Sequence, residues 1–183
     1  YEALIALCRH HGLWLLHDEI FHGLGPSVTE HLPFSADLYE RGLSLGVMSK
    51  SYGLPGLRIG WIACQDREML VRMERPKHYL SIRNSGPTQR LALIALKARA
   101  RILARNCEIV DANLPLWAGF FAERPDLFEW SPPQGSCMAF PRYTGSDGVE
   151  TFARALVEKA GVLVLPASIY ASELGPTPQD RFR

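Results

Sequence analysis

Lys50 and Arg58 lie eight positions apart, at places in the chain where a charged side chain is costly. Lys50 follows the apolar run at 43–48, and Arg58 stands near the start of the apolar run at 57–64. Near the interior, both cations need an anionic or electrophilic partner. A lysine amine desolvated at the end of a strand becomes a nucleophile that can form a Schiff base with an aldehyde. An arginine presents a planar fork of donors that suits a phosphate.

Asp18 adds a carboxylate to this pair of cations. It lies near the end of another apolar run, LWLLHDEI at 13–20. A carboxylate buried at the end of a strand favours a cationic partner, and a protonated pyridine nitrogen would serve. An amine for an aldehyde, a fork for a phosphate and an acid for a pyridinium together describe pyridoxal phosphate, so the sequence predicts a site for this cofactor.

The hydrophobic pattern predicts the elements that position these side chains. Apolar residues at helical spacing predict a helix at 2–11 that stops at Gly12. The three apolar runs have the pattern of strands that are covered on both faces. A helix followed by such strands indicates α/β layering, in which ligands gather outside the carboxyl ends of the strands.

The rest of the chain predicts further helices and a change of character near Leu127. Helices are expected at 66–77, about 88–105 and about 107–123, with Pro115 kinking or interrupting the last one. Beyond them we expect two short strands around a Pro/Gly turn, an amphipathic helix ending at Gly161, a strand VLVLP and a final strand beginning at DRFR. The expected domains are 1–123 and 124–183.

Composition excludes several classes of protein. The chain has 183 residues, 47% hydrophobic and 21% charged, which is an ordinary soluble composition. A net charge of +1 does not imply a nucleic-acid partner, and no apolar run approaches the roughly 18 residues that span a membrane. The four cysteines lack CxxC spacing and indicate reduced thiols in a cytoplasmic protein. The histidines lack metal-ligand spacing, so no metal is expected.

Two motifs carry a resemblance to a known family. HDEIF at 17–21, followed by SKSYGLPGLRIG at 49–60, resembles the class I/II aminotransferases of the fold-type I pyridoxal-phosphate family. PQGSCMAFPRY resembles the start of the family's small domain, and DRFR resembles its segment that binds the substrate carboxylate. The resemblance implies an α/β fold with a three-layer, mainly parallel sheet, residues 1–123 being the second half of the large cofactor-binding domain with its interdomain helix. Residues 124–183 would be part of a smaller α+β domain, and the full-length protein a homodimer.

The resemblance also implies a role for each matching residue. Lys50 resembles the lysine that forms the Schiff base and later shuttles the substrate α-proton. Asp18 resembles the acid that keeps the pyridine nitrogen protonated, and Arg58 resembles the arginine that binds the phosphate. Ser49 keeps a hydroxyl contact beside the lysine. Arg183 resembles the arginine that grips the substrate α-carboxylate.

Two positions depart from the family pattern. The family usually has a tyrosine three residues after the aspartate, where its phenol hydrogen-bonds the cofactor O3′, but this chain has Phe21. The family usually has serine or glycine three residues before the lysine, where this chain has Val47. Because Phe21 cannot donate, it is expected to change the protonation of the bound cofactor and puts the reaction type in question.

Three functions remain open. The first is an aminotransferase that moves an amino group between an amino acid and a 2-oxo acid. The second keeps the cofactor but is a lyase, decarboxylase or cyclising enzyme of amino-acid-derived metabolism. The third is a non-catalytic, aminotransferase-like domain of a regulator. The chain begins inside a helical pattern and stops inside a strand pattern, so we expect a fragment that is inactive by itself.

Overall fold

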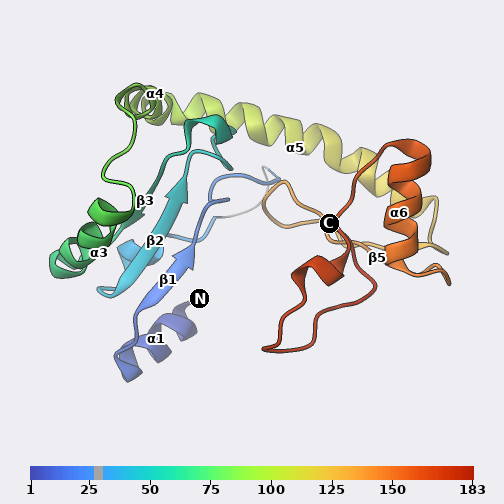
Figure 1. Ribbon diagram of the computed structural model, residues 1–183, viewed down its shortest axis with the longest axis horizontal. Coiled ribbons are helices and arrows are strands. Elements are labelled where there is room, and N and C mark those ends of the chain that lie inside the picture. The colour runs from blue at the N-terminus through green and yellow to red at the C-terminus, as the bar shows by residue number, and fades with distance from the viewer. Residues whose placement is uncertain (27–30) are drawn as a thin grey trace. The chain divides into compact units, whose positions relative to one another are not determined.

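The computed structural model describes residues 1–26 and 31–183 (Figure 1). Contacts divide these residues into two compact units, Tyr1–Glu108 and Ile109–Arg183. This division falls inside a long helix, whereas the sequence placed the boundary after residue 123. The assignment of the two parts to a large and a small domain stays a prediction.

The elements follow one another in a mixed order of helices and strands. The first unit contains α1 (Glu2–His11), β1 (Leu15–Asp18), α2 (Ser35–Leu38), β2 (Gly42–Val47), the 3-10 helix η1 (Pro55–Leu57), β3 (Gly60–Ala63), α3 (Arg67–Leu80) and α4 (Gly86–Lys97). Helix α5 (Arg99–Ala122) begins in the first unit and ends in the second. The second unit continues with β4 (Phe128–Glu129), β5 (Arg142–Tyr143), α6 (Val149–Ala160) and the 3-10 helix η2 (Ala167–Tyr170).

A three-stranded sheet with the order β1-β2-β3 organises the first unit. β1 and β2 are parallel, with Asp18 opposite Leu45, while β3 runs antiparallel to β2, with Gly60 opposite Val47. β3 therefore begins at the end of the sheet where β1 and β2 finish. We call this the loop end of the sheet. All three apolar runs form strands as predicted, and the α/β class is confirmed.

One face of the sheet carries α1 and α2. Ile5 and Cys8 of α1 form a small core with Tyr39 at the end of α2, and Leu15 of β1 packs against it. On the other face Leu16 is 62% exposed. Every residue of β3 is also exposed, so within the described residues the sheet is not covered on both faces as the apolar runs predicted.

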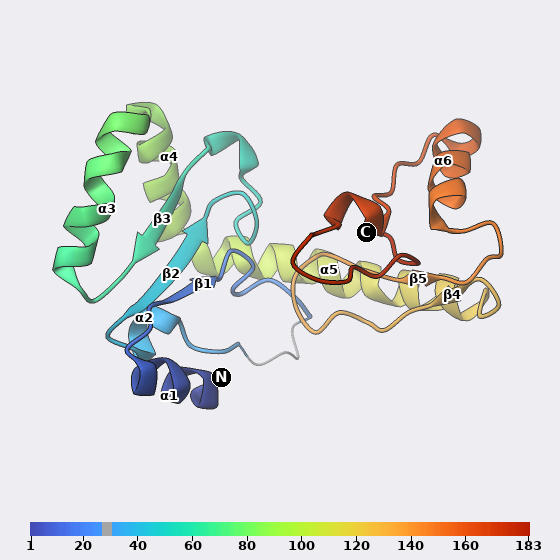
Figure 2. The same cartoon turned by 60° about the horizontal axis from the view of Figure 1, so that its bottom comes forward.

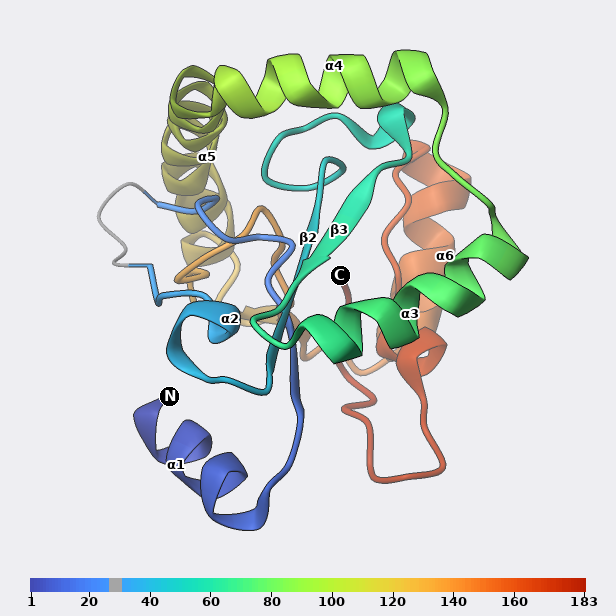
Figure 3. The ribbon, with the colours of Figure 1, turned by 90° about the vertical axis from the view of Figure 1, so that its left-hand side faces the viewer.

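Helix α4 supports the segment that follows β2. Ala92 and Ala95 of α4 pack against Met48, whose side chain is completely buried, and the segment between β2 and β3 packs around them. Figure 3 shows α4 lying across this segment. The small side chains of these alanines let α4 approach Met48 closely, so the helix packs against the segment that carries Lys50.

The helix boundaries partly match the sequence prediction. Gly12 adopts φ 63° and ends α1, as expected. The helix expected at about 88–105 is wrong in one respect, because α4 ends at Lys97 and α5 starts at Arg99. Pro115 lies within α5 without ending it. Among the residues described, no helix has both the length and the apolar character needed to cross a membrane.

The second unit is built around aromatic side chains. The antiparallel pair β4–β5 lies beside α6 and the end of α5 (Figure 2). The buried residues of its core are Phe121, Phe128, Tyr143, Val149 and Phe182. The strands expected at VLVLP and DRFR form only isolated bridges, Pro166 with Phe182 and Arg142 with Arg181. Their pairing is too short to be regular strands.

Candidate active site

Lys50 lies in the turn that follows β2, at the loop end of the sheet. The turn is closed by a hydrogen bond from the Gly53 N–H to the Lys50 carbonyl, at 2.8 Å. The half-buried Lys50 side chain reaches over Phe21, with its Nζ 5.7 Å from the ring centroid. Phe21 follows β1, so the turns after two parallel strands meet here.

Asp18 is the last residue of β1. Its Oδ1 accepts a hydrogen bond of 3.3 Å from the Ile20 N–H, which turns the chain out of the strand. The sequence predicted a buried carboxylate, but Asp18 is exposed within the described residues. Its carboxylate is therefore accessible to a ligand at the loop end.

Arg58 reaches the same end of the sheet from the opposite direction. It lies two residues before β3 and caps η1 in the left-handed region, with φ 51°. Its Nη1 donates a hydrogen bond of 3.0 Å to the Pro55 carbonyl, and the side chain is exposed. Because β3 is antiparallel to β2, the backbone of Arg58 lies at the same end of the sheet as the turn that holds Lys50.

Ser51 joins the two turns by hydrogen bonds, although no sequence pattern singled it out. Its backbone N–H and its Oγ both donate to the Ile20 carbonyl, at 3.3 and 3.0 Å. Ser51 is 3% exposed, so these bonds are shielded from water. Ser49, which precedes Lys50, lies half-buried in the same turn.

A cavity of about 390 Å³ opens beside these turns. Its lining includes Val47, Ser51, Tyr52, Trp61, His22 and Glu19. The Trp61 indole lies over Gly46, where an added Cβ would stand 2.4 Å from the ring. The ring centroids of Tyr52 and Trp61 are 6.3 Å apart in a T-shaped arrangement. Asp18, Lys50 and Arg58 are not among the residues that line this cavity, so it adjoins the turns without enclosing the predicted cofactor residues.

Glu19 anchors the polar network beneath Asp18. Its Oε1 accepts a hydrogen bond of 2.7 Å from the Ser35 N–H at the start of α2 and lies 3.0 Å from His17 Nδ1. The Tyr1 hydroxyl lies 2.9 Å from the same His17 nitrogen. Burial and the Glu19 charge raise the pKa of Tyr1 above its ordinary value. The network therefore fixes the strand that carries Asp18.

Comparison with known proteins decides the family. The family model "Aminotransferase class I and II" matches residues 1–183. The chain belongs to this family of aminotransferases. A capreomycidine synthase from Streptomyces vinaceus is 31% identical over 159 residues, covering 85% of this chain and 40% of that protein. A probable N-succinyldiaminopimelate aminotransferase from Mycobacterium tuberculosis is 28% identical over 160 residues, covering 86% of this chain and 40% of that protein.

A solved structure extends the likeness to three dimensions. A pyridoxal-phosphate-dependent aminotransferase from Streptococcus suis is 27% identical to this aminotransferase-family chain, with a TM-score of 0.83. The match covers 91% of this chain and 43% of the other. The chain thus spans about 40% of the length of the curated relatives that it matches. These matches confirm the fold type that the two motifs predicted.

The side chains at the loop end fit the cofactor of this aminotransferase family. Lys50, Asp18, Arg58 and Ser49 stand at or next to the loop end, where they offer an amine, a carboxylate, a guanidinium and a hydroxyl. This donor set matches the aldehyde, the pyridine nitrogen and the phosphate of pyridoxal phosphate. Phe21 offers a ring and no donor.

Arg183 belongs to the second unit. Its backbone exchanges two hydrogen bonds with Leu165, at 3.0 and 2.8 Å, and its Nη1 donates to the Tyr170 hydroxyl at 3.1 Å. The guanidinium is exposed. The backbone bonds hold Arg183 in place independently of its side chain. Its role toward a substrate carboxylate stays a prediction.

Proposed function

We propose that the whole protein carrying this chain is a pyridoxal-phosphate-dependent aminotransferase, which moves an amino group between an amino acid and a 2-oxo acid. The observation that carries the proposal is the strand pairing, which places the backbones of Asp18, Lys50 and Arg58 at or near one end of the sheet, in a chain of the aminotransferase family. The pairing of the strands supports a common site for these residues although 40 positions separate the first from the last.

Each residue has a distinct task in this proposal. Lys50 binds the cofactor aldehyde and then moves the substrate α-proton with its Nζ. Asp18 keeps the pyridine nitrogen protonated by placing a negative charge beside it. Arg58 holds the phosphate with its planar fork, and the Ser49 hydroxyl assists. The bound cofactor supplies an electron sink for the negative charge that develops at the substrate α-carbon.

Arg183 and a partner subunit complete the proposal. A guanidinium can pair with the substrate α-carboxylate in a bidentate way that lysine would not match. We expect a homodimer in the cytoplasm, acting on an amino acid and a 2-oxo acid, without nucleic acid or membrane as partner.

A cyclising reaction on the same cofactor is the second candidate. Two observations support it: the 31% identity to a protein named as a synthase, capreomycidine synthase, and Phe21, which lacks the phenol that the family usually places near the cofactor. The amine, acid and guanidinium would serve either reaction up to the loss of the α-proton. The two candidates differ in what leaves the site afterwards.

The test uses the whole protein with pyridoxal phosphate. Borohydride should fix the cofactor on the peptide that contains Lys50, and Lys50→Ala should abolish this label while Lys97→Ala, an exposed lysine on α4, leaves it unchanged. Amino acids and 2-oxo acids are then supplied as a panel. Transfer of the amino group supports the aminotransferase, whereas a cyclic product formed without a 2-oxo acid supports the second candidate.

Attachment at another lysine, or no attachment at all, would remove the basis of both candidates. A non-catalytic domain would bind the cofactor without converting any amino acid of the panel. The label and the products are read separately, so a failure of binding is distinguished from a failure of chemistry.

A further inference from the structure

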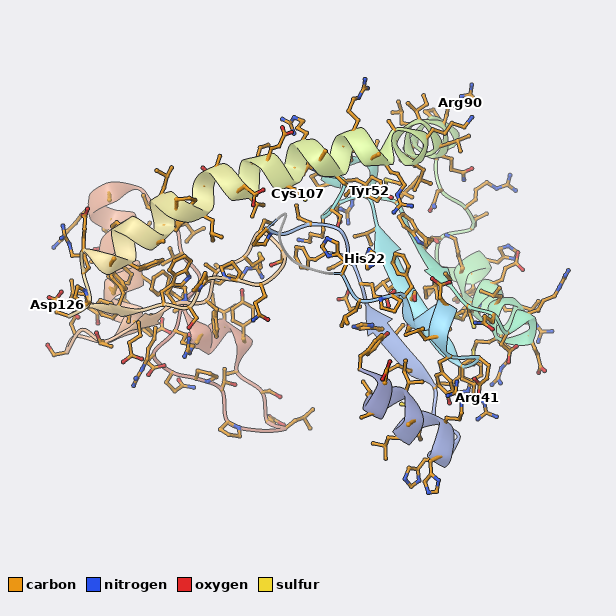
Figure 4. The ribbon with its side chains drawn as sticks, turned by 180° about the vertical axis from the view of Figure 1, so that it is seen from behind. His22, Arg41, Tyr52, Arg90, Cys107 and Asp126 are labelled. Atoms are coloured by element: carbon orange, nitrogen blue, oxygen red, sulfur yellow. The ribbon has the colours of Figure 1, made fainter. Side chains whose placement is uncertain are left out.

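One face of α5 contacts both turns at the loop end. Leu103, Asn106 and Cys107 lie at positions i, i+3 and i+4 of the helix, which share one face, and all three are half-buried. A Leu103 methyl group lies 3.2 Å from the place that a Cβ added at Gly23 would take. Cys107 Sγ lies 3.4 Å from the Gly23 carbonyl oxygen. Figure 4 shows Cys107 on the side of α5 toward the loops of His22 and Tyr52.

Asn106 binds the backbone next to Lys50. Its Nδ2 donates a hydrogen bond of 2.8 Å to the carbonyl of Ser51. Arg105 Nη1 donates to Asn106 Oδ1 at 3.1 Å, which orients the amide with its NH2 group toward Ser51. A donor on the helix therefore fixes the peptide group between Ser51 and Tyr52, one residue beyond the lysine.

The same contact continues to the turn after β1. Ser51 donates twice to the Ile20 carbonyl, and Ile20 lies between Asp18 and Phe21. One line of hydrogen bonds thus runs from α5 through the Lys50 turn to the residues expected at the cofactor. The Asn106 amide also lies 3.4 Å from the Cβ position of Gly53, whose φ of +64° closes the turn.

We propose that Asn106 is a positioning residue of the active site, which holds the Lys50 turn and, through Ser51, the turn of Asp18 and Phe21. The inference rests on the proposed function. Without the amide donor, the Ser51 carbonyl loses its partner and the turn can shift. A misplacement of about 1 Å in a reacting group can cost about 100-fold in rate.

The decisive variant is Asn106→Asp in the whole protein. It keeps the shape of the side chain but turns the donor into an acceptor, and Arg105 can pair with the new carboxylate, so the fold is retained. Asn106→Leu removes both polar atoms, and Asn113→Asp, an exposed residue further along α5, is the matched control. For each protein we would measure the rate at which pyridoxal phosphate becomes reducible onto Lys50, kcat, KM and the melting temperature.

Both Asn106 variants should slow attachment at Lys50 and lower kcat by about 10- to 100-fold, with KM within about threefold and a melting temperature close to that of the parent. The control should match the parent. Unchanged attachment and kcat in Asn106→Asp would overturn the proposal, as would loss of the fold in both variants, which would make Asn106 structural. A parent protein that never attaches the cofactor at Lys50 would instead refute the proposed function on which the inference rests.

Discussion

The ammonium nitrogen of Lys50 lies 5.7 Å from the centre of the Phe21 ring. A cation over an aromatic face is attracted by about 0.5–1 kcal/mol at exposed sites and more when it is desolvated. Both residues are half-buried, so Phe21 helps to hold the amine in place. It does so without the hydroxyl group that a tyrosine would offer at this position.

Phe21→Tyr should restore a hydrogen-bond donor near the bound cofactor. A phenol that donates to the cofactor oxygen stabilises its ionised form, so the visible band of the bound cofactor should titrate at lower pH than in the parent. Absorbance spectra recorded between pH 5 and pH 10 would measure this, with Phe120→Tyr on the exposed side of α5 as control. A titration that does not move would mean that Phe21 does not face the cofactor.

Asp18→Asn should leave the backbone turn intact but remove the negative charge. The amide oxygen can still accept from the Ile20 N–H. Loss of the charge should leave the pyridine nitrogen unprotonated and slow α-proton removal by far more than tenfold, which corresponds to about 1.4 kcal/mol of barrier. Single-turnover kinetics with cofactor-saturated protein would test this. A change below tenfold would count against the assigned role.

Arg183→Ala should weaken the binding of amino acids and leave cofactor binding nearly unchanged. A bidentate, partly desolvated pair with the α-carboxylate is worth about 2–4 kcal/mol, given about 1.5–3 for each charged hydrogen bond and incomplete additivity. Arg181→Ala is the matched control, because its Nη1 binds the Phe140 carbonyl at 2.9 Å. Equal losses for substrate and cofactor would identify Arg183 as a structural residue.

Gly46→Ala should destabilise the sheet. The new methyl group would stand 2.4 Å from the Trp61 ring, so the indole or the strand must move, at a cost of about 1–3 kcal/mol. Gly56→Ala is the control, since nothing lies within 4 Å of its Cβ position. Urea unfolding would measure both changes. Adding Trp61→Leu to Gly46→Ala should recover part of the loss, and no recovery would place the strain elsewhere.

Asp180 should make the second unit sensitive to acid. Its hydrogen bond from Arg142 lowers the pKa of the Asp180 carboxyl below its ordinary value of 3.8. A lowered native pKa means that the ionised group stabilises the fold above about pH 4 and that this contribution is lost as the pH falls further. Asp180→Asn should therefore lower the melting temperature at pH 7, and the difference should shrink below pH 4. A difference that persists in acid would assign it to packing.

Much of the chemistry could be predicted from residue types at short spacing. Lys50 and Arg58 lie close in the chain among glycines, and Asp18 closes an apolar run. The end of α1 at Gly12 could also be predicted, because helices often end at a residue in the left-handed conformation and glycine adopts that conformation without steric cost. The break between α4 and α5 at Ala98 could not be predicted, because the pattern of apolar residues continues through it.

The sequence by itself determined which functional groups are present and that they follow strands, because both depend on residue type and local periodicity. Only the tertiary structure decided that β3 runs antiparallel and returns Arg58 to the loop end. It alone also revealed that Ser51 binds Ile20 across 31 positions and that Asn106 binds Ser51 across 55. Such bonds depend on how distant segments pack, and a local pattern of side chains does not encode the partner of a backbone carbonyl.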